Sequence, residues 1–189
     1  VIGIRPSKGS LAEYGVTYRQ VELLEDGTFD YEAIKNAINE RTKLVEIQRS
    51  KGYLTRPTFS VKQIGELIHF IKEIKPDVIC MVDNCYGEFV ERIEPSDVGA
   101  DMVVGSLIKN PGGGLAPIGG YIVGTKECVE NAAYRLAINI KKTQKRANAL
   151  KNITIPKYEE LTKSISNALE EKEREEFTRL KVIKRMQGK

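Results

Sequence analysis

The sequence predicts an α/β domain built on a mostly parallel sheet, followed by a long helical tail. Apolar runs alternate with an amphipathic segment in the first part, and fifteen of the sixteen glycines lie before residue 136. The remaining residues are dense in charge and almost free of glycine, which is typical of long helices. The net charge changes at the same place, from −3 over residues 1–135 to +7 over residues 136–189. We therefore expect two parts with these boundaries.

The first part opens with a short helix and a strand. Asp30 has a side chain suited to cap a helix, and Ile34, Ala37 and Ile38 follow it on one helical face. The next run, residues 43–48, is apolar and partly β-branched, which is typical of a strand.

A capping box predicts the start of a second helix, because Ser60 is followed three residues later by Gln63. Pro76 predicts its end. Between them, apolar residues recur at helical spacing: Ile64, Leu67, Ile68, Ile71 and Ile74. The continuous apolar run 78–82 then predicts a strand buried on both faces of a parallel sheet. Strand, helix and strand together form a βαβ unit.

A third strand is predicted from residue 102, in a run that leads to Ser106 and Lys109. The glycine-rich residues 110–114 predict a turn, and residues 120–123 have the composition of a further strand. Since that strand follows too closely for a helical crossover, we expect it to pair antiparallel.

Two charged residues follow strands at the edge where open α/β sheets bind ligands. Asp83 comes directly after the run 78–82, and Lys109 precedes the glycine-rich turn. A partly desolvated lysine can have its pKa lowered and form a Schiff base, and an aspartate can partner a protonated pyridine nitrogen. A structural ion pair, or two solvated side chains, would show the same spacing. Both interpretations stay open on spacing alone.

Four segments, taken together, resemble a known family. They are Gln48–Tyr53 (QRSKGY), Val82–Phe89 (VDNCYGEF), Gly99–Asp101 (GAD) and Gly105–Gly114 (GSLIKNPGGG). In this order they resemble the pyridoxal-phosphate enzymes of cysteine and methionine metabolism, in the branch called methionine gamma-lyase-related or aluminium-resistance proteins. The resemblance covers roughly residues 1–135. It implies part of the large domain of a fold-type-I enzyme, with carbon–sulfur lyase-like activity on an amino acid.

The same resemblance implies roles for three residues. Lys109 would hold pyridoxal 5′-phosphate as a Schiff base and then serve as general base or acid. Asp83 would keep the pyridine nitrogen protonated, so that the ring can accept electrons. Ser106 would donate to the cofactor phosphate. Better-known lyases of this class have a threonine directly before the lysine; this chain has Ile108 there, so that contact is absent.

The family's extent implies further segments. Its N-terminal region, with a phosphate-cradling glycine turn and an aromatic residue that stacks on the ring, would precede Val1. Its C-terminal domain, with the arginine that binds the substrate carboxylate, would follow Arg135. We therefore expect residues 1–135 to be incomplete for catalysis and to form homo-oligomers through open sheet edges.

Other candidate residues have structural interpretations that compete with functional ones. His69 is the only histidine, which excludes a histidine dyad, and we expect it on the surface. Cys85, beside Asp83, is expected to be a packing residue rather than a nucleophile. Arg49 could meet a substrate carboxylate, although a surface salt bridge is favoured. Glycines 112–114 lack the dinucleotide fingerprint, so a turn is favoured over a phosphate nest.

The second part carries an apolar stripe with the four–three spacing of a coiled coil. Its members are residues 136, 140, 143, 147 and 150, and then Leu161, Ile165, Leu169, Phe177, Leu180 and Ile183. Pro156 is expected to kink or interrupt the helix. A single helix cannot bury such a stripe, so a partner helix is implied. The basic residues within 141–146 favour a solvated face over an acidic partner or nucleic acid.

Segments of the tail resemble the C-terminal helix of the D subunit of V-type and archaeal-type ATPases. They are Lys142–Leu150 (KTQKRANAL), Ile155-Pro156 and Ala168–Lys181 (ALEEKEREEFTRLK). In that family the D subunit is the rotating central stalk of a proton-transporting ATPase. The resemblance implies a non-catalytic stalk component with ATPase catalytic-head subunits as partners. Together the two resemblances imply a fusion, in which neither function need survive.

Composition excludes several other classes. No apolar run reaches eighteen residues, so we expect no direct membrane insertion. Three cysteines without metal-ligand spacing, and no signal-peptide pattern at the N-terminus, indicate a reduced, cytoplasmic protein without a metal site. A net charge of +4 is too small to predict nucleic-acid binding.

Overall fold

The computed structural model describes residues 10–109 and 116–187. It divides into two compact units, Val1–Asn131 and Ala132–Lys189. The first unit contains the sheet and the second is helical. The division falls inside helix α3 (Lys126–Ala149).

The first unit is built on a four-stranded sheet in the order β1-β2-β3-β4. The strands are β1 (Leu44–Gln48), β2 (Ile79–Asp83), β3 (Met102–Ser106) and β4 (Gly120–Gly124). The first three run parallel, and β4 pairs antiparallel with β3. Both the parallel βαβ unit and the antiparallel last strand were predicted from the sequence, and both are confirmed.

Side-chain caps begin two helices of the sheet unit, as predicted. Asp30 accepts a hydrogen bond from the backbone N–H of Ala33 at 2.9 Å. Ser60 and Gln63 form a capping box, in which each side chain accepts from the other residue's backbone N–H. Such caps stabilise a helix by about 1 kcal/mol. The helices are α1 (Tyr31–Ala37) and α2 (Val61–Ile74), with short 3-10 turns at η1 (Leu11–Tyr14) and η2 (Pro95–Val98).

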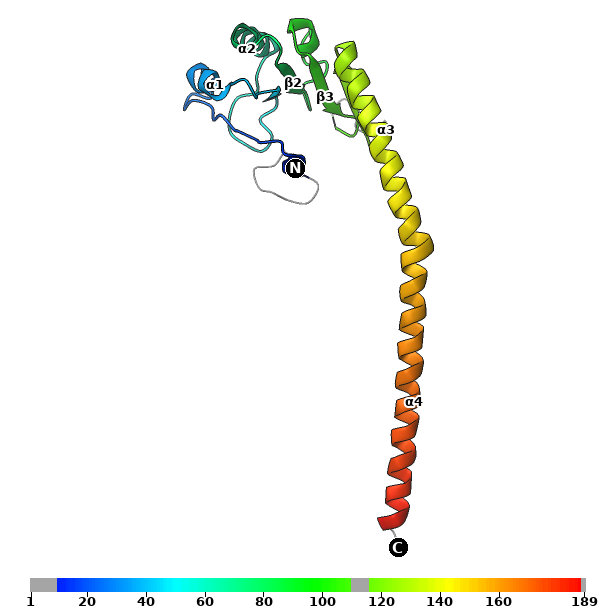
Figure 1. Cartoon of the computed structure of the whole chain (residues 1–189). Helices are drawn as coiled ribbons and strands as arrows, with labels where there is room; N and C mark the ends of the chain where they lie inside the picture. Colours follow the sequence, from blue (N-terminus) through cyan, green and yellow to red (C-terminus); the bar gives the residue numbers. More distant parts are fainter. Residues whose placement is uncertain (1–9, 110–115, 188–189) are drawn as a thin grey trace. The chain divides into compact units, whose positions relative to one another are not determined.

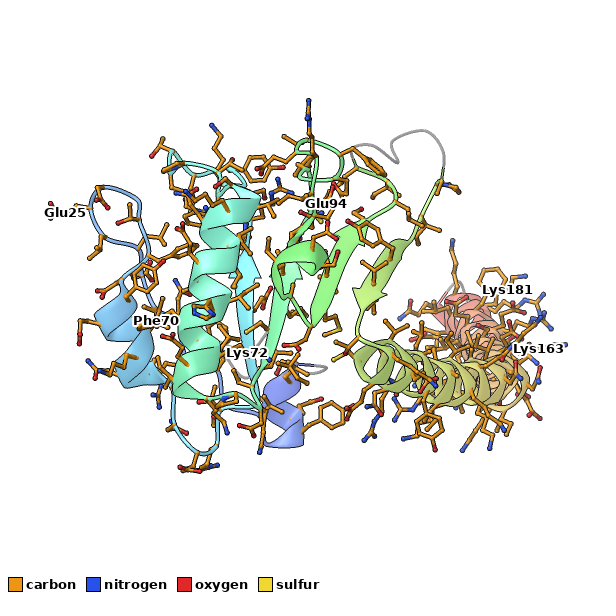
Figure 2. The ribbon with its side chains drawn as sticks, turned by 90° about the horizontal axis from the view of Figure 1, so that it is seen from above. Glu25, Phe70, Lys72, Glu94, Lys163 and Lys181 are labelled. Atoms are coloured by element: carbon orange, nitrogen blue, oxygen red, sulfur yellow. The ribbon has the colours of Figure 1, made fainter. Side chains whose placement is uncertain are left out.

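Helix α2 covers one face of the sheet and forms the core with it (Figure 2). Five of its side chains are buried: Val61, Ile64, Leu67, Ile68 and Ile71. The core also contains alternate strand residues: Ile47, Cys80, Val82 and Val103. Each large aliphatic side chain contributes about 1.5–3 kcal/mol when fully buried, so this packing decides which way every strand residue faces.

The opposite face of the sheet is only partly covered, which corrects the expectation that β2 is buried on both faces. Cys80 and Val82 are buried, whereas Ile79, Met81 and Asp83 are half-buried. Successive side chains of a strand point to opposite faces, and α2 lies on one of them.

Ion pairs hold the helix and loops at both ends of the strands, where Figure 2 labels Lys72 and Glu94. At the amino end, Lys72 of α2 lies 2.7 Å from Asp101 and donates to the carbonyl of Val78. Asp101 also accepts from the backbone N–H of Cys80 at 2.8 Å. At the carboxyl end, Glu94 belongs to a larger network around a buried arginine.

Residues 126–187 form one helix of 62 residues, coloured from yellow-green to red in Figure 1. It consists of α3, a π-helical turn (Leu150–Thr154) and α4 (Ile155–Gln187). Pro156 has no N–H to donate, and the wider π turn before it accommodates the ring; there the N–H of Ile155 donates to the carbonyl of Leu150. The expected interruption is therefore a change of hydrogen-bond pattern, and the helix continues.

The apolar stripe of the tail has no cover, since no residue of α3 or α4 is buried. Leu136, Leu161 and Leu169 are each half-exposed or more. Among the residues described, no helix has both the length and the apolarity needed to cross a bilayer.

Candidate functional site

Asp83 ends β2 on the sheet face that α2 leaves uncovered. Its register partners are Gln48 in β1 and Val104 in β3. Partners in register share a face, so the Asp83 carboxylate lies opposite the core. Its Oδ1 accepts from the backbone N–H of Cys85 at 3.1 Å. Within residues 10–109 and 116–187 this carboxylate forms no ion pair, with Lys109 or with any other cation.

Glu46 places a second carboxylate on the same face. It is in register with Met81, two residues before Asp83. Burial raises the pKa of the Glu46 carboxyl, and the negative charge of Asp83 raises it further. Asp83 is half-buried and Glu46 is exposed, and neither carboxylate pairs with a cation among the described residues. Two such carboxylates on one face favour the binding of a positively charged group beside them.

Ser106 and Lys109 approach the same edge from β3. Ser106 is the last residue of the strand and shares the face of Val104 and Asp83. The ammonium of Lys109 lies 5.3 Å from the centre of the Tyr86 ring, a cation–π arrangement. The predicted turn of residues 110–114 lies outside the described residues.

The Cys85 thiol lies beside Asp83 and is influenced by both Asp83 and Lys109. Burial raises the pKa of the Cys85 thiol most; its hydrogen bond to Asp83 and that carboxylate's charge raise it further, and Lys109 lowers it. A raised pKa keeps the thiol protonated, which agrees with a packing role for Cys85.

Arg49 is buried, so neither interpretation drawn from the sequence was right. Its side chain is only 2 % exposed. One guanidinium nitrogen, Nη1, donates to Asn84 Oδ1 and to the carbonyl of Gly87, each at 2.8 Å. The other, Nη2, lies 2.7 Å from Glu91. Arg49 is thus neither a surface residue nor free to bind a substrate carboxylate.

The Arg49 network fixes the loop that follows Asp83. Asn84 donates through Nδ2 to Glu94 at 3.0 Å, and Glu94 also accepts from the backbone N–H of Phe89 at 2.8 Å. Tyr86 and Phe89 have φ values of 69° and 58°, a region that non-glycine residues rarely adopt. Hydrogen bonds to the loop stabilise this unusual backbone and so hold Tyr86 beside Lys109.

A second contact joins this loop to β4. The phenol of Tyr121 donates to Glu88 Oε1 at 2.9 Å, and burial raises the pKa of Tyr121, so it stays a donor. The Tyr121 ring lies over Gly105. A Cβ atom added at position 105 would lie 2.3 Å from the Cζ of Tyr121, which is too close for any side chain there. Glu88 is 7 % exposed, and its Oε2 has no hydrogen-bond partner among the described residues. Glycine at position 105 therefore lets β4 reach the loop after β2.

Sequence reasoning missed Tyr86, Glu88 and Tyr121. Their roles depend on a left-handed turn and on a contact between β4 and the loop after β2, which no short-range pattern encodes. The single available signal was Gly105 inside a predicted strand, since a strand glycine often marks close approach of another group.

Two family models match the chain. The one described as methionine gamma-lyase matches residues 1–153, and the one for the ATP synthase D subunit matches residues 126–185. The uncharacterized protein YnbB of Bacillus subtilis is 52 % identical over 138 residues, which are 72 % of this chain and 33 % of YnbB. The V-type ATP synthase D subunit of Thermotoga neapolitana is 55 % identical over 56 residues, 30 % of this chain and 28 % of that protein.

Solved structures share the fold of the sheet unit. A carbon–sulfur lyase involved in aluminum resistance from Clostridium novyi superposes with a TM-score of 0.67 at 49 % identity, covering 72 % of this chain and 33 % of that one. The cystathionine gamma-lyase of Lactobacillus plantarum, at 23 % identity and a TM-score of 0.52, shares the fold alone. The chain spans about a third of the length of YnbB and of the Clostridium lyase.

Replacing Arg49 should destabilise the sheet unit. Arg49→Met leaves Asn84 Oδ1 and the Gly87 carbonyl without this donor and removes the cation paired with Glu91, which keeps its hydrogen bond from the Val61 N–H. The expected cost is about 2–3 kcal/mol, since Glu91 can regain some water. Hydrogen exchange of the β2 amides in the full chain measures this loss. Lys62→Met, which breaks an exposed pair with Glu66, is the control and should cost less than about 0.5 kcal/mol. Equal exchange in the two variants would contradict the structural role of Arg49.

Alkylation of Cys85 should report the charges around it. Burial raises the pKa of Cys85 most, and Asp83→Asn removes a charge that raises it further, so alkylation by iodoacetamide at fixed pH should become severalfold faster. Lys109→Ala removes the group that lowers this pKa and should slow the reaction. Peptide mass spectrometry measures both rates, with Cys128 of the same molecule as internal reference. Changes in the same direction for both variants would contradict the arrangement.

Proposed function

The chain belongs to the methionine gamma-lyase family, and we propose on this basis that residues 1–135 are the cofactor-bearing part of a pyridoxal-phosphate-dependent lyase that cleaves a carbon–sulfur bond in an amino acid. The observation that carries the proposal is that Asp83 and Ser106 share the sheet face that α2 leaves uncovered, with Lys109 held beside Tyr86 of the loop that follows Asp83. The boundary at 135/136 between this part and the tail is part of the proposal.

The groups at this edge fit the chemistry of the cofactor. Asp83 and Glu46 offer negative charge without a cation among the described residues, which suits a protonated pyridine nitrogen. Lys109 offers a primary amine held near an aromatic ring and in no ion pair within the described residues. Ser106 offers a hydroxyl donor suited to a phosphate oxygen.

When bound, the cofactor supplies an electron sink for the bond that breaks at the substrate's Cα. Asp83 holds a proton at the pyridine nitrogen by providing the opposite charge. The amine of Lys109 takes up and returns protons on the substrate side. Arg49 acts further away, by holding the loop that carries Asn84 and Tyr86 in place.

Residues beyond the matched third of the relatives would complete the site. We propose that this part contributes cofactor chemistry while a substrate carboxylate needs an arginine from elsewhere, because Arg49 is already committed to Glu91. Homo-oligomerisation through the edge strands β1 and β4 is part of the same proposal. A cytoplasmic location is supported by three free cysteines.

The second candidate function is a non-catalytic central-stalk component of a rotary ATPase. It is favoured by the match of residues 126–185 to the ATP synthase D subunit and by the uncovered apolar stripe on α3 and α4. A coiled-coil partner would bury that stripe, and ATPase head subunits would then be the partners.

Borohydride reduction of the full chain with pyridoxal 5′-phosphate should trap the cofactor on Lys109. Peptide mass spectrometry locates the adduct, and Lys109→Ala should abolish it, while Lys51→Ala, at an exposed lysine, should not. Asp83→Asn should keep the adduct, because the amine is intact, but weaken cofactor affinity through the lost charge. An adduct on another lysine, or one that survives Lys109→Ala, contradicts the proposal.

If the tail is a stalk component, the full chain should bind an ATPase catalytic head that lacks its own central stalk. Comigration in size-exclusion chromatography measures binding. Leu161→Glu with Ile165→Glu should abolish it, because charges on the stripe oppose burial. The matched control, Lys163→Glu, changes charge within the same turn and should bind. Failure of the unmodified chain to bind removes this candidate.

A further inference from the structure

The tail carries an apolar stripe that must find a partner outside its own helix. Its side chains are between 49 % and 61 % exposed at Leu136, Ile140, Leu150, Leu161, Ile165, Leu169, Phe177, Leu180 and Ile183. Full burial of side chains this size is worth about 1.5–3 kcal/mol each, so half of that remains available at every position. Sustained along a helix of this length, the stripe can hold a stable helix pair.

Two carboxylates interrupt the stripe. Glu173 lies four residues from both Leu169 and Phe177, and Glu176 lies four residues before Leu180, so both are on the stripe's side of the helix. Neither forms an ion pair within the described part of the chain, whereas nearby Glu170 pairs with Arg174 at 3.5 Å. A partner helix that covers the stripe would remove these carboxylates from water, and cations on that helix would offset the cost.

The tail itself contains the matching cations. Residues 141–146 hold four Lys or Arg and no acidic residue, and residues 170–176 hold five Glu with two basic residues. Within the basic segment, Arg146 lies three residues after Thr143 and four before Leu150, and therefore flanks the stripe. Lys142 precedes it by one turn. The two segments lie at nearly equal distances on either side of Tyr158.

We propose that the tail pairs with the tail of a second copy of this chain, antiparallel and centred near Tyr158. In this register, Ala147 of one copy faces Leu169 of the other. Lys142 then lies within one turn of the second copy's Glu176, and Arg146 within one turn of its Glu173. Two-fold symmetry makes the contact twice. A parallel pair would instead set Glu173 against Glu173 and Arg146 against Arg146, which repel.

The proposal rests on neither of the proposed functions. It requires no cofactor at Lys109, and it competes with ATPase subunits for the same stripe. Antiparallel and parallel pairs can be told apart by distance. In the antiparallel pair, the two copies of residue 147 are 22 residues apart along the helix axis, about 33 Å, whereas residue 147 of one copy is adjacent to residue 169 of the other.

Disulfide trapping in the full chain tests the register. Ala147→Cys combined with Leu169→Cys should give an oxidised dimer whose linked peptides join position 147 to position 169, as read by mass spectrometry. The single variant Ala147→Cys should not crosslink to itself. A 147–147 disulfide, which a parallel pair would form, overturns the proposal, and so does a chain that light scattering shows to be monomeric at tens of micromolar.

Charge exchange tests the recognition. Glu173→Lys with Glu176→Lys should weaken dimerisation at least tenfold at low salt, as measured by sedimentation. Adding Lys142→Glu and Arg146→Glu to the same chain should restore it, because the charges are again complementary. Circular dichroism checks that all variants keep their helix. The proposal is overturned if the two Glu→Lys substitutions leave dimerisation unchanged, which association through the sheet unit would give. It is also overturned if Lys142→Glu and Arg146→Glu do not restore dimerisation.

Discussion

The buried guanidinium of Arg49 has lost its hydrogen bonds to water, so the fold must supply acceptors for it. Groups at the carboxyl end of the sheet supply them. Asn84, the Gly87 carbonyl and Glu91 meet this demand from the loop after β2, while the backbone N–H of Arg49 itself donates to the carbonyl of Asp83. A buried cation without such partners would cost several kcal/mol. The loop conformation, including the left-handed Tyr86, is therefore coupled to the burial of Arg49 and contributes to the stability of the sheet unit.

The two sides of the sheet carry different kinds of residue: those that stabilise the fold lie on one side, and those that could bind a ligand lie on the other. Residues of one parity along the strands, continued by Arg49 and Asn84, belong to the core side. Residues of the other parity, Asp83 and Ser106 among them, lie on the open side. Because strand residues alternate, a stabilising network and a ligand-binding edge can occupy adjacent positions in sequence without interfering. The pair Asp83-Asn84 is the clearest case, with one side chain on each side of the sheet.

Much of this fold is readable from sequence, and the reasons are local. Ser60 with Gln63, the spacing from Ile64 to Ile71 and the short link before β4 each report a structure formed within a few residues. Asp83 and Lys109 could be placed at one edge because parallel strands end together. The environment of Arg49 could not, because its acceptors are supplied by residues 35 to 42 positions later, and no pattern distinguishes a surface arginine from one the loop encloses. The contact of Tyr121 with Glu88 was unreadable for the same reason.

The segment matched by both families, residues 126–153, lies within the unbroken helix formed by α3 and the π turn. Two segments joined inside a helix need no linker, since the backbone geometry is the same on both sides of the joint. A joint of this kind fixes the rotational position of the following residues about the helix axis. Each residue gained or lost between Lys126 and Ala149 would turn everything after it by about 100° about the helix axis. Length variation here is therefore expected in steps of about seven or eleven residues, close to two or three full turns, because such steps return the stripe to nearly the same side.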